Sequence, residues 1–151
     1  MVWLEGLSYL VTILGFPAAI FVFIYEYRRG RANEENEIHR QLSAEYDDFM
    51  RLVLDNADLL LHRRAKPYNL SEEQAERRDI LFHILVSLFE KAYIILYEDN
   101  LSGDARRRWQ SWEDDMHEWC SRPDFREALP AMLEGEDDAF SHHILAIANP
   151  R

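Results

Sequence analysis

A run of 20 residues without a charged side chain, GLSYLVTILGFPAAIFVFIY at residues 6–25, most constrains what this chain can form. As a helix with a rise of about 1.5 Å per residue, the run spans the roughly 30 Å hydrocarbon core of a bilayer. Glu5 and Glu26 flank it, so their charges avoid the lipid interior, where a charge costs several kcal/mol. The run therefore predicts a transmembrane helix, with residues 1–27 as a membrane anchor.

The residues that flank the run predict its orientation. Arg28, Arg29 and Arg31 follow it and no Lys or Arg precedes it, so the positive-inside rule places the C-terminal side in the cytoplasm. These arginines are expected to contact the headgroups of the inner leaflet. A cleaved signal peptide would need a basic start and small residues at its cleavage site, where this chain has FVFIYEY. A buried core helix is the other alternative, but 20 uncharged residues are long for one.

Three residues near the middle of the run suggest that another membrane helix docks there. Pro17 removes one backbone donor and crowds the preceding turn, which predicts a kink. Gly15 and Ala19 are four residues apart, a spacing that lets two helices approach closely. Gly, Ala and Pro are also common in spanning helices that have no such partner, so both interpretations stay open.

The charge of the chain excludes one large class of partners. Of the net charge of −11, residues 1–27 carry −2, and residues 28–151 carry the other −9. So acidic a domain is repelled by phosphate backbones, which argues against nucleic acid as a partner. The single cysteine, Cys120, rules out an internal disulfide and suits a reducing cytoplasm.

Helical patterns dominate the chain after the anchor. Residues 28–55 carry apolar side chains at three- and four-residue steps, which predicts an amphipathic juxtamembrane helix that Gly30 is able to bend or break. Residues 56–70 are expected to form a connector with one short turn. Ser71 and Gln74 form a capping-box pattern that starts a helix over residues 72–98. Its segment ILFHILVSLFEKAYIILY is apolar on nearly all sides, so we expect other elements to surround it.

A second membrane span is the competing interpretation of that segment, but Glu90 and Lys91 in its second half make lipid costly. The tryptophans that follow occupy a single helical face, because Trp109, Trp112, Met116 and Trp119 stand at offsets of 0, 3, 7 and 10 residues. Shorter helices are expected over residues 124–133 and 136–148. The predicted fold is all-α, with a helical cytoplasmic domain at residues 56–151 packed around helix 72–98. The expected core consists of Phe82, Leu85, Leu88, Phe89, Tyr93, Trp109, Trp112 and Trp119.

No catalytic motif is recognisable in the sequence. Phosphate-binding glycine loops, HExxH, CxxC and GxSxG are absent from it. Glu113, Asp114 and His117 are the nearest approach to a metal site, but a di-metal bundle needs such pairs on two helices. We therefore expect no catalytic residue, cofactor or metal. Glu90 and Lys91 are interpreted as ion-pair partners of the arginine cluster at residues 106–108.

Four motifs carry a resemblance to a protein family. They are Gly15-Phe16-Pro17 in the span, Arg31-Ala32-Asn33-Glu34 after it, the Leu-Phe-Glu-x-Ala-Tyr step at residues 88–93, and the Trp-x-x-Trp…Trp-Cys-x-Arg-Pro-x-Phe run at residues 109–125. With these the chain resembles small bacterial single-pass membrane proteins that carry a Trp-rich helical cytoplasmic domain. The resemblance covers most of the chain and implies the bacterial inner membrane as its location. It implies no activity.

Three classes of function are compatible with this architecture. The favoured one is a non-enzymatic accessory or scaffold subunit, which docks on other membrane-protein subunits and presents its acidic domain to them. The alternative is a self-associating homo-oligomer that forms a pore or signals, for which the span offers few polar residues. An enzyme is the least favoured. The expected partners are the lipid bilayer and other membrane subunits, with a hetero-complex preferred over a homo-oligomer.

Overall fold

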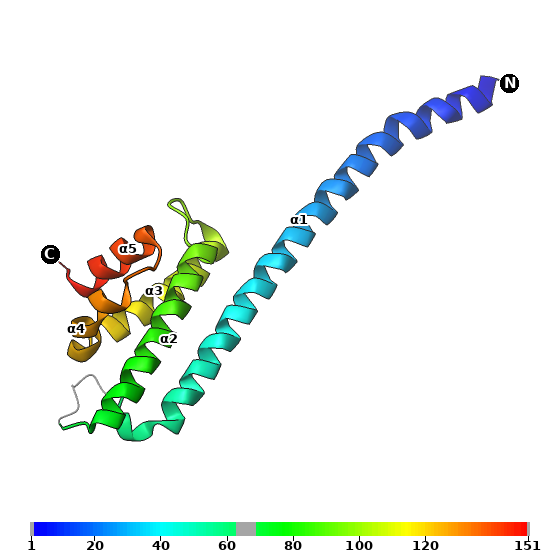
Figure 1. Ribbon diagram of the computed structural model, residues 1–151. Helices are drawn as coiled ribbons and strands as arrows, with labels where there is room; N and C mark the ends of the chain where they lie inside the picture. The colour runs from blue at the N-terminus through cyan, green and yellow to red at the C-terminus, as the bar shows by residue number, and fades with distance from the viewer. Residues whose placement is uncertain (1, 63–68, 151) are drawn as a thin grey trace. The chain divides into compact units, whose positions relative to one another are not determined.

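The structure is a computed structural model. It describes the backbone of residues 2–62 and 69–150, and within them the side chains of residues 20–27, 29–30, 36–62 and 69–150. This part of the chain contains helices and no strand, so the prediction of an all-α fold is confirmed. The elements in chain order are α1 (Val2–Asp55), the 3₁₀ turn η1 (Ala57–Leu59), α2 (Glu72–Leu96), α3 (Gly103–Cys120), α4 (Pro123–Met132) and α5 (Asp138–Ala148) (Figure 1).

The chain divides into two compact units, Met1–Gln41 and Leu42–Arg151, and the division falls within α1. The first unit is the N-terminal part of α1, which passes Gly30 as continuous helix. Among the residues whose side chains are described, no helical stretch has both the length and the apolar character to cross a membrane. Residues 6–19 of the predicted span lie outside those residues.

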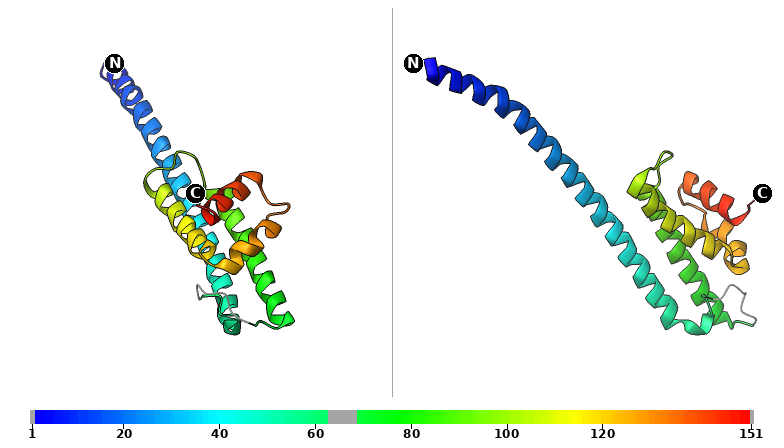
Figure 2. Two further views of the ribbon diagram at one scale, coloured as in Figure 1. Left: turned by 90° about the vertical axis from the view of Figure 1, so that its left-hand side faces the viewer. Right: turned by 180° about the vertical axis from the view of Figure 1, so that it is seen from behind.

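The second unit is a bundle in which α2 and α3 lie side by side. Residues 42–55 of α1 cross one face of this pair, and α4 and α5 cover the other face (Figures 1 and 2). Tyr46 and Phe49 bring α1 against the tryptophans of α3: the Tyr46–Trp112 ring centroids are 5.6 Å apart and those of Phe49 and Trp119 are 5.7 Å apart. The compact unit therefore includes the second half of the predicted amphipathic helix.

Local sequence signals set the helix ends in this bundle. The Ser71 hydroxyl accepts a hydrogen bond from the backbone N–H of Gln74 at 3.2 Å, and the Gln74 side chain accepts one from the Ser71 N–H at 3.0 Å. This is the predicted capping box. Pro123 is the first residue of α4, where its missing N–H costs nothing. Gly135 lies in the turn between α4 and α5, and its φ of +96° is a backbone conformation that favours glycine.

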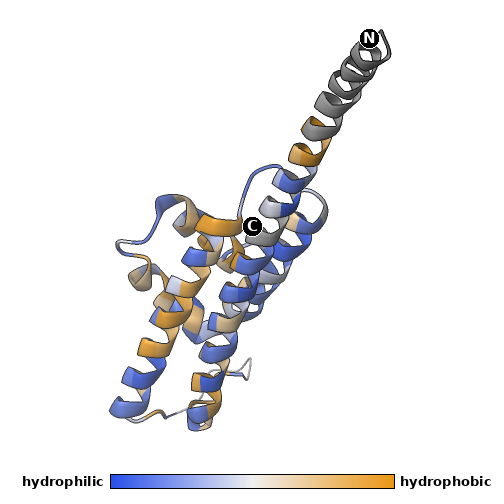
Figure 3. Ribbon diagram, turned by 90° about the vertical axis from the view of Figure 1, so that its right-hand side faces the viewer, coloured by the Kyte–Doolittle hydropathy of each residue, from blue (hydrophilic) through white to orange (hydrophobic). Residues whose placement is uncertain are grey.

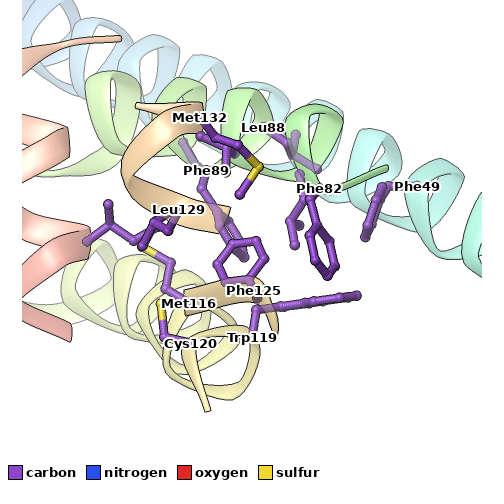
Figure 4. Close-up of a cluster of buried hydrophobic side chains, with 14 of the residues drawn as sticks. Phe49, Phe82, Leu88, Phe89, Met116, Trp119, Cys120, Phe125, Leu129 and Met132 are labelled. Atoms are coloured by element: carbon purple, nitrogen blue, oxygen red, sulfur yellow. The ribbon is translucent and has the colours of Figure 1, made fainter. Parts of the chain in front are cut away.

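The core is built from aromatic rings in edge-to-face contact. The rings of Phe82 and Phe125 lie 5.1 Å apart at 87°, and Trp119 closes the cluster against Phe82 at 6.3 Å and 81° (Figure 4). Such edge-to-face pairs add about 0.5–1.5 kcal/mol to the gain from burial. The structure buries seven of the eight expected core residues, and the eighth, Tyr93, is half-buried.

A buried ion pair closes the corner between α3 and α4. Arg122 donates from Nε to Oδ1 of Asp124 at 3.1 Å and from Nη2 to Oδ2 at 2.8 Å, and both side chains are almost fully buried. The remaining Nη1 donates to the backbone carbonyls of Leu60 and Leu61 in the connector. Asp124 also accepts the N–H of Phe125 at 3.1 Å. One guanidinium thus joins the connector to the start of α4.

Replacing Arg122 with Met should destabilise the domain by about 3–5 kcal/mol, because the Asp124 carboxylate is left buried without its cation. Urea unfolding of the full chain, followed by tryptophan fluorescence, measures this. Arg107→Met is the matched control: Arg107 and Asp104 form an ion pair whose side chains are 84% and 80% exposed. Its loss should change stability by under about 1 kcal/mol. Equal effects of the two variants would contradict the structural role given to Arg122.

Asp115 on α3 carries a half-buried carboxyl, and burial makes its charged form unfavourable. Burial raises the pKa of Asp115 to about 6, a hydrogen bond with Tyr46 opposes this, and the nearby charges of Glu118 and Asp114 raise it further. The same burial raises the pKa of Tyr46 to about 12. A carboxyl whose pKa is higher in the folded than in the unfolded chain favours folding when protonated, so this contribution is lost as pH rises through the interval from about 4 to about 6.

Asp115→Asn should therefore stabilise the protein at pH 7 by about 1 kcal/mol, less than the whole pKa shift implies because water screens a half-buried group. Near pH 4 the carboxyl is largely protonated, so the gain should shrink. Urea unfolding of both chains at pH 4, 5.5 and 7 checks the trend. A gain that is the same at all three pH values would contradict the assignment.

Candidate functional site: an apolar stripe on α2

One face of α2 is apolar and open to solvent. Ile80, Ile84, Ile94 and Ile95 are 53%, 40%, 61% and 47% exposed. The expectation that other elements surround this helix on all sides is therefore wrong for the described residues. The physical reason is that α3, α4 and α5 cover only the side of α2 that carries Phe82, Leu85 and Phe89, and a groove separates the opposite side from α1.

The exposed residues fall into a regular row, which we call the α2 stripe: Ile80, Ile84, Ser87, Lys91 and Ile94. Their spacing alternates between four and three residues, which keeps all five on one helical face. All five side chains are exposed. Figure 3 shows apolar residues recurring along most of α2. Three of the five are isoleucines, and exposed apolar side chains grouped on one face are typical of an interaction site.

Ile84, Ser87 and Lys91 of the stripe line a groove of about 530 Å³ between α2 and the end of α1. Its apolar lining includes Phe49 and Leu52 from α1 and Ile84 and Leu88 from α2. Lys91 closes one part of it by an ion pair with Glu45, with Nζ 2.6 Å from the carboxylate oxygen. The pair bridges the two helices and leaves the groove without a net charge at that point.

This ion pair corrects the partners that the sequence suggested. Lys91 binds Glu45 of α1, and Glu90 accepts the backbone N–H of Asp137 at 2.6 Å, in front of α5. Arg106 instead donates to the carbonyl of Leu101, and Arg107 to Asp104. The pair of Lys91 with Glu45 could not be predicted, because the sequence does not show that α1 lies beside α2.

The residues predicted to act at the membrane are described only in part. Gly15, Pro17, Ala19, Arg28 and Arg31 lie outside the residues whose side chains the structure describes. Arg29 is described and is exposed. The hypotheses of helix docking and of inner-leaflet contact therefore stay predictions.

The histidine, carboxylate and cysteine side chains considered as metal ligands or nucleophiles lie in environments that explain them as parts of the fold. His143 lies 3.3 Å from Glu113 across α3 and α5. Burial lowers the pKa of His143, while the Glu113 charge acts against this. Burial raises the pKa of the Cys120 thiol to about 12, which makes it a poor nucleophile. No group of three or more His, Cys, Asp or Glu side chains suited to a metal ion occurs in the part of the chain that the structure describes.

Comparison of the chain with protein-family models, with curated proteins and with solved structures found no match. The candidate site therefore rests on the α2 stripe itself. A row of isoleucines beside an apolar groove, with one neutralised ion pair, is suited to packing against another helix.

The spacing of polar residues in α2 indicated this exposed face, although the helix is apolar at most positions. His83, Ser87 and Lys91 recur every four residues and mark one edge of the helix as polar. In the structure all three are exposed, and all three line the groove.

Ile94→Gln should leave the free energy of unfolding within about 0.5 kcal/mol of the wild type, because Ile94 contacts mostly solvent in the single chain. Leu85→Ala, on the buried side of α2, should cost about 2–5 kcal/mol. Urea unfolding at a protein concentration low enough to prevent association tests both variants. A loss above about 2 kcal/mol for Ile94→Gln would show that the stripe is covered within one chain.

Proposed function

We propose that this chain is a non-enzymatic single-pass membrane protein that serves as an accessory or scaffold subunit of a larger membrane complex. Residues 6–25 anchor it in the bacterial inner membrane, and the helical domain lies on the cytoplasmic side. Gly15, Pro17 and Ala19 dock on a helix of another subunit, and Arg28, Arg29 and Arg31 contact the inner leaflet.

The observation that carries the proposal is the run of 20 uncharged residues that ends before three arginines. Its last residues support the same conclusion, because Phe21 and Phe23 are 73% and 69% exposed. Large apolar side chains on an open helix surface are stable in lipid and costly in water. The α2 stripe supports a scaffolding role, since it offers a second surface for assembly.

Replacing both Gly15 and Ala19 with Leu should reduce recovery of the membrane partner by about tenfold or more, because bulky side chains hold two helices apart. The measurement is affinity purification of the full chain from membranes in mild detergent, with mass spectrometry of the bound subunits. The matched control is Ile13→Leu with Phe21→Leu, at positions that helical spacing places away from Gly15 and Ala19.

Two results would overturn the proposal. One is unchanged partner recovery by the double variant, which removes the docking argument. The other is recovery of the wild-type chain in the supernatant after ultracentrifugation of detergent-free lysate, which removes the anchor.

A further inference from the structure

The groove between α1 and α2 has the size and the lining of a small-molecule site. Its volume of about 530 Å³ lies within the roughly 300–1,000 Å³ that such sites occupy. Phe49 of α1 and Leu88 of α2 (Figure 4) are 2% and 6% exposed and form its deepest part. Leu52 and Ile84 are 41% and 40% exposed and form its open sides. An apolar lining from two helices therefore leads from the solvent to the core.

An ion pair across the groove limits the width of what enters it. Lys91 of α2 and Glu45 of α1 both line the groove, and they join its two sides with Nζ 2.6 Å from the carboxylate oxygen. A helix is about 10–12 Å across with its side chains, so it would have to break this pair to lie between α1 and α2. A single extended aliphatic chain is far narrower and fits along the groove with the pair intact. The ion pair thus favours a chain-like small molecule over a helix.

We propose that this groove binds one aliphatic chain that carries an uncharged polar head, as in a long-chain alcohol. Its lining residues on α2 run from His83 to Lys91, about 12 Å at 1.5 Å per residue, which is close to the length of an extended decyl chain. The inference goes beyond the proposed function, because it assigns a small molecule to a surface apart from the anchor. Ile80 and Ile94 of the α2 stripe do not line the groove and stay available for assembly.

The charges around the groove favour an uncharged head. Its lining contains two carboxylates, and both have a cationic partner. Glu45 is paired with Lys91, as described above. Asp48 lies 2.7 Å from Arg51. A cationic head would have to displace one of these partners. An anionic head would meet both carboxylates and the net charge of −11 of the chain.

Two uncharged side chains of the lining are suited to a hydroxyl head. Nδ1 of His83 lies 2.8 Å from the carbonyl oxygen of Asp79, which only accepts, so in the neutral imidazole Nδ1 carries the proton and Nε2 is an acceptor. The Ser87 hydroxyl both donates and accepts. His83 and Ser87 line the groove one helical turn apart. A hydroxyl at the end of the chain therefore finds both a donor and an acceptor on α2.

Photolabelling of the full chain in detergent-free cell lysate tests the proposal. The probe is decan-1-ol that carries a diazirine at the end of its chain, and irradiation attaches it to the groups that it contacts. Mass spectrometry of the denatured chain should find label at residues 45–52 and 83–91, and excess decan-1-ol should remove it. Absence of this label, or label that decan-1-ol does not reduce, would overturn the proposal. Label at residues 6–25 reports contact with lipid, so failure of the anchor is read separately from failure of the groove.

Two isoleucines on α2 give a matched pair of variants. Ile84→Gln should lower the groove label about fivefold or more, because the chain loses an apolar contact. Ile94→Gln, the same change outside the groove, should leave the label within about twofold of the wild type. Ser87→Phe, which fills the groove from an exposed position, should abolish the label. An unchanged circular dichroism spectrum shows that each variant is folded. Equal loss of label in the two isoleucine variants contradicts binding in the groove.

Competition identifies the head and excludes other occupants. Decanoate and decyltrimethylammonium should need free concentrations about tenfold higher than decan-1-ol to remove the label, because each brings an unpaired charge into the groove. Equal competition by either ion would overturn the uncharged head. Affinity purification of Ser87→Phe tests a protein occupant. Reduced recovery of a partner subunit or of a second copy would assign the groove to protein and overturn the small molecule, whereas unchanged recovery supports it.

Discussion

The bundle depends on one guanidinium. Arg122 is 3% exposed and uses its donors on Asp124 and on the carbonyls of Leu60 and Leu61. Leu60 has a left-handed backbone conformation, with φ +52°, which a leucine adopts only where its surroundings hold it. The hydrogen bonds from Arg122 supply that restraint. They fix the connector after α1 against the start of α4, so a single side chain joins segments 61 and 62 residues apart.

The parts of this fold that were predictable from the sequence are those decided by neighbours along the chain. The Ser71–Gln74 box needs only its own four residues. The short helix expected from residue 124 begins one residue earlier, at Pro123, whose fixed φ suits a first helical position. The face of Trp109, Trp112 and Trp119 follows from the helical period alone, and all three are buried. These signals are local, so a sequence contains them in full.

The parts that were not predictable depend on how distant segments approach. Nothing near Arg122 in the sequence indicates that its partners include carbonyls 61 and 62 residues away. The same holds for Lys91, which reaches Glu45, 46 residues earlier. The open side of α2 was missed because a count of apolar residues does not say how many neighbours a helix has. The polar edge at His83, Ser87 and Lys91 was the better guide.

An exposed apolar stripe promotes non-specific association of a freely diffusing protein. Under the proposed function, in which the chain is anchored in a membrane, the same stripe is a usable binding surface. In solution, isoleucines at 53% and 61% exposure invite non-specific association, and the chain's net charge of −11 opposes it. Under the proposed function, subunits held in one membrane meet at a much higher effective concentration, so a small surface suffices for binding. Under the proposed function, the anchor and the acidity together make so short a stripe specific.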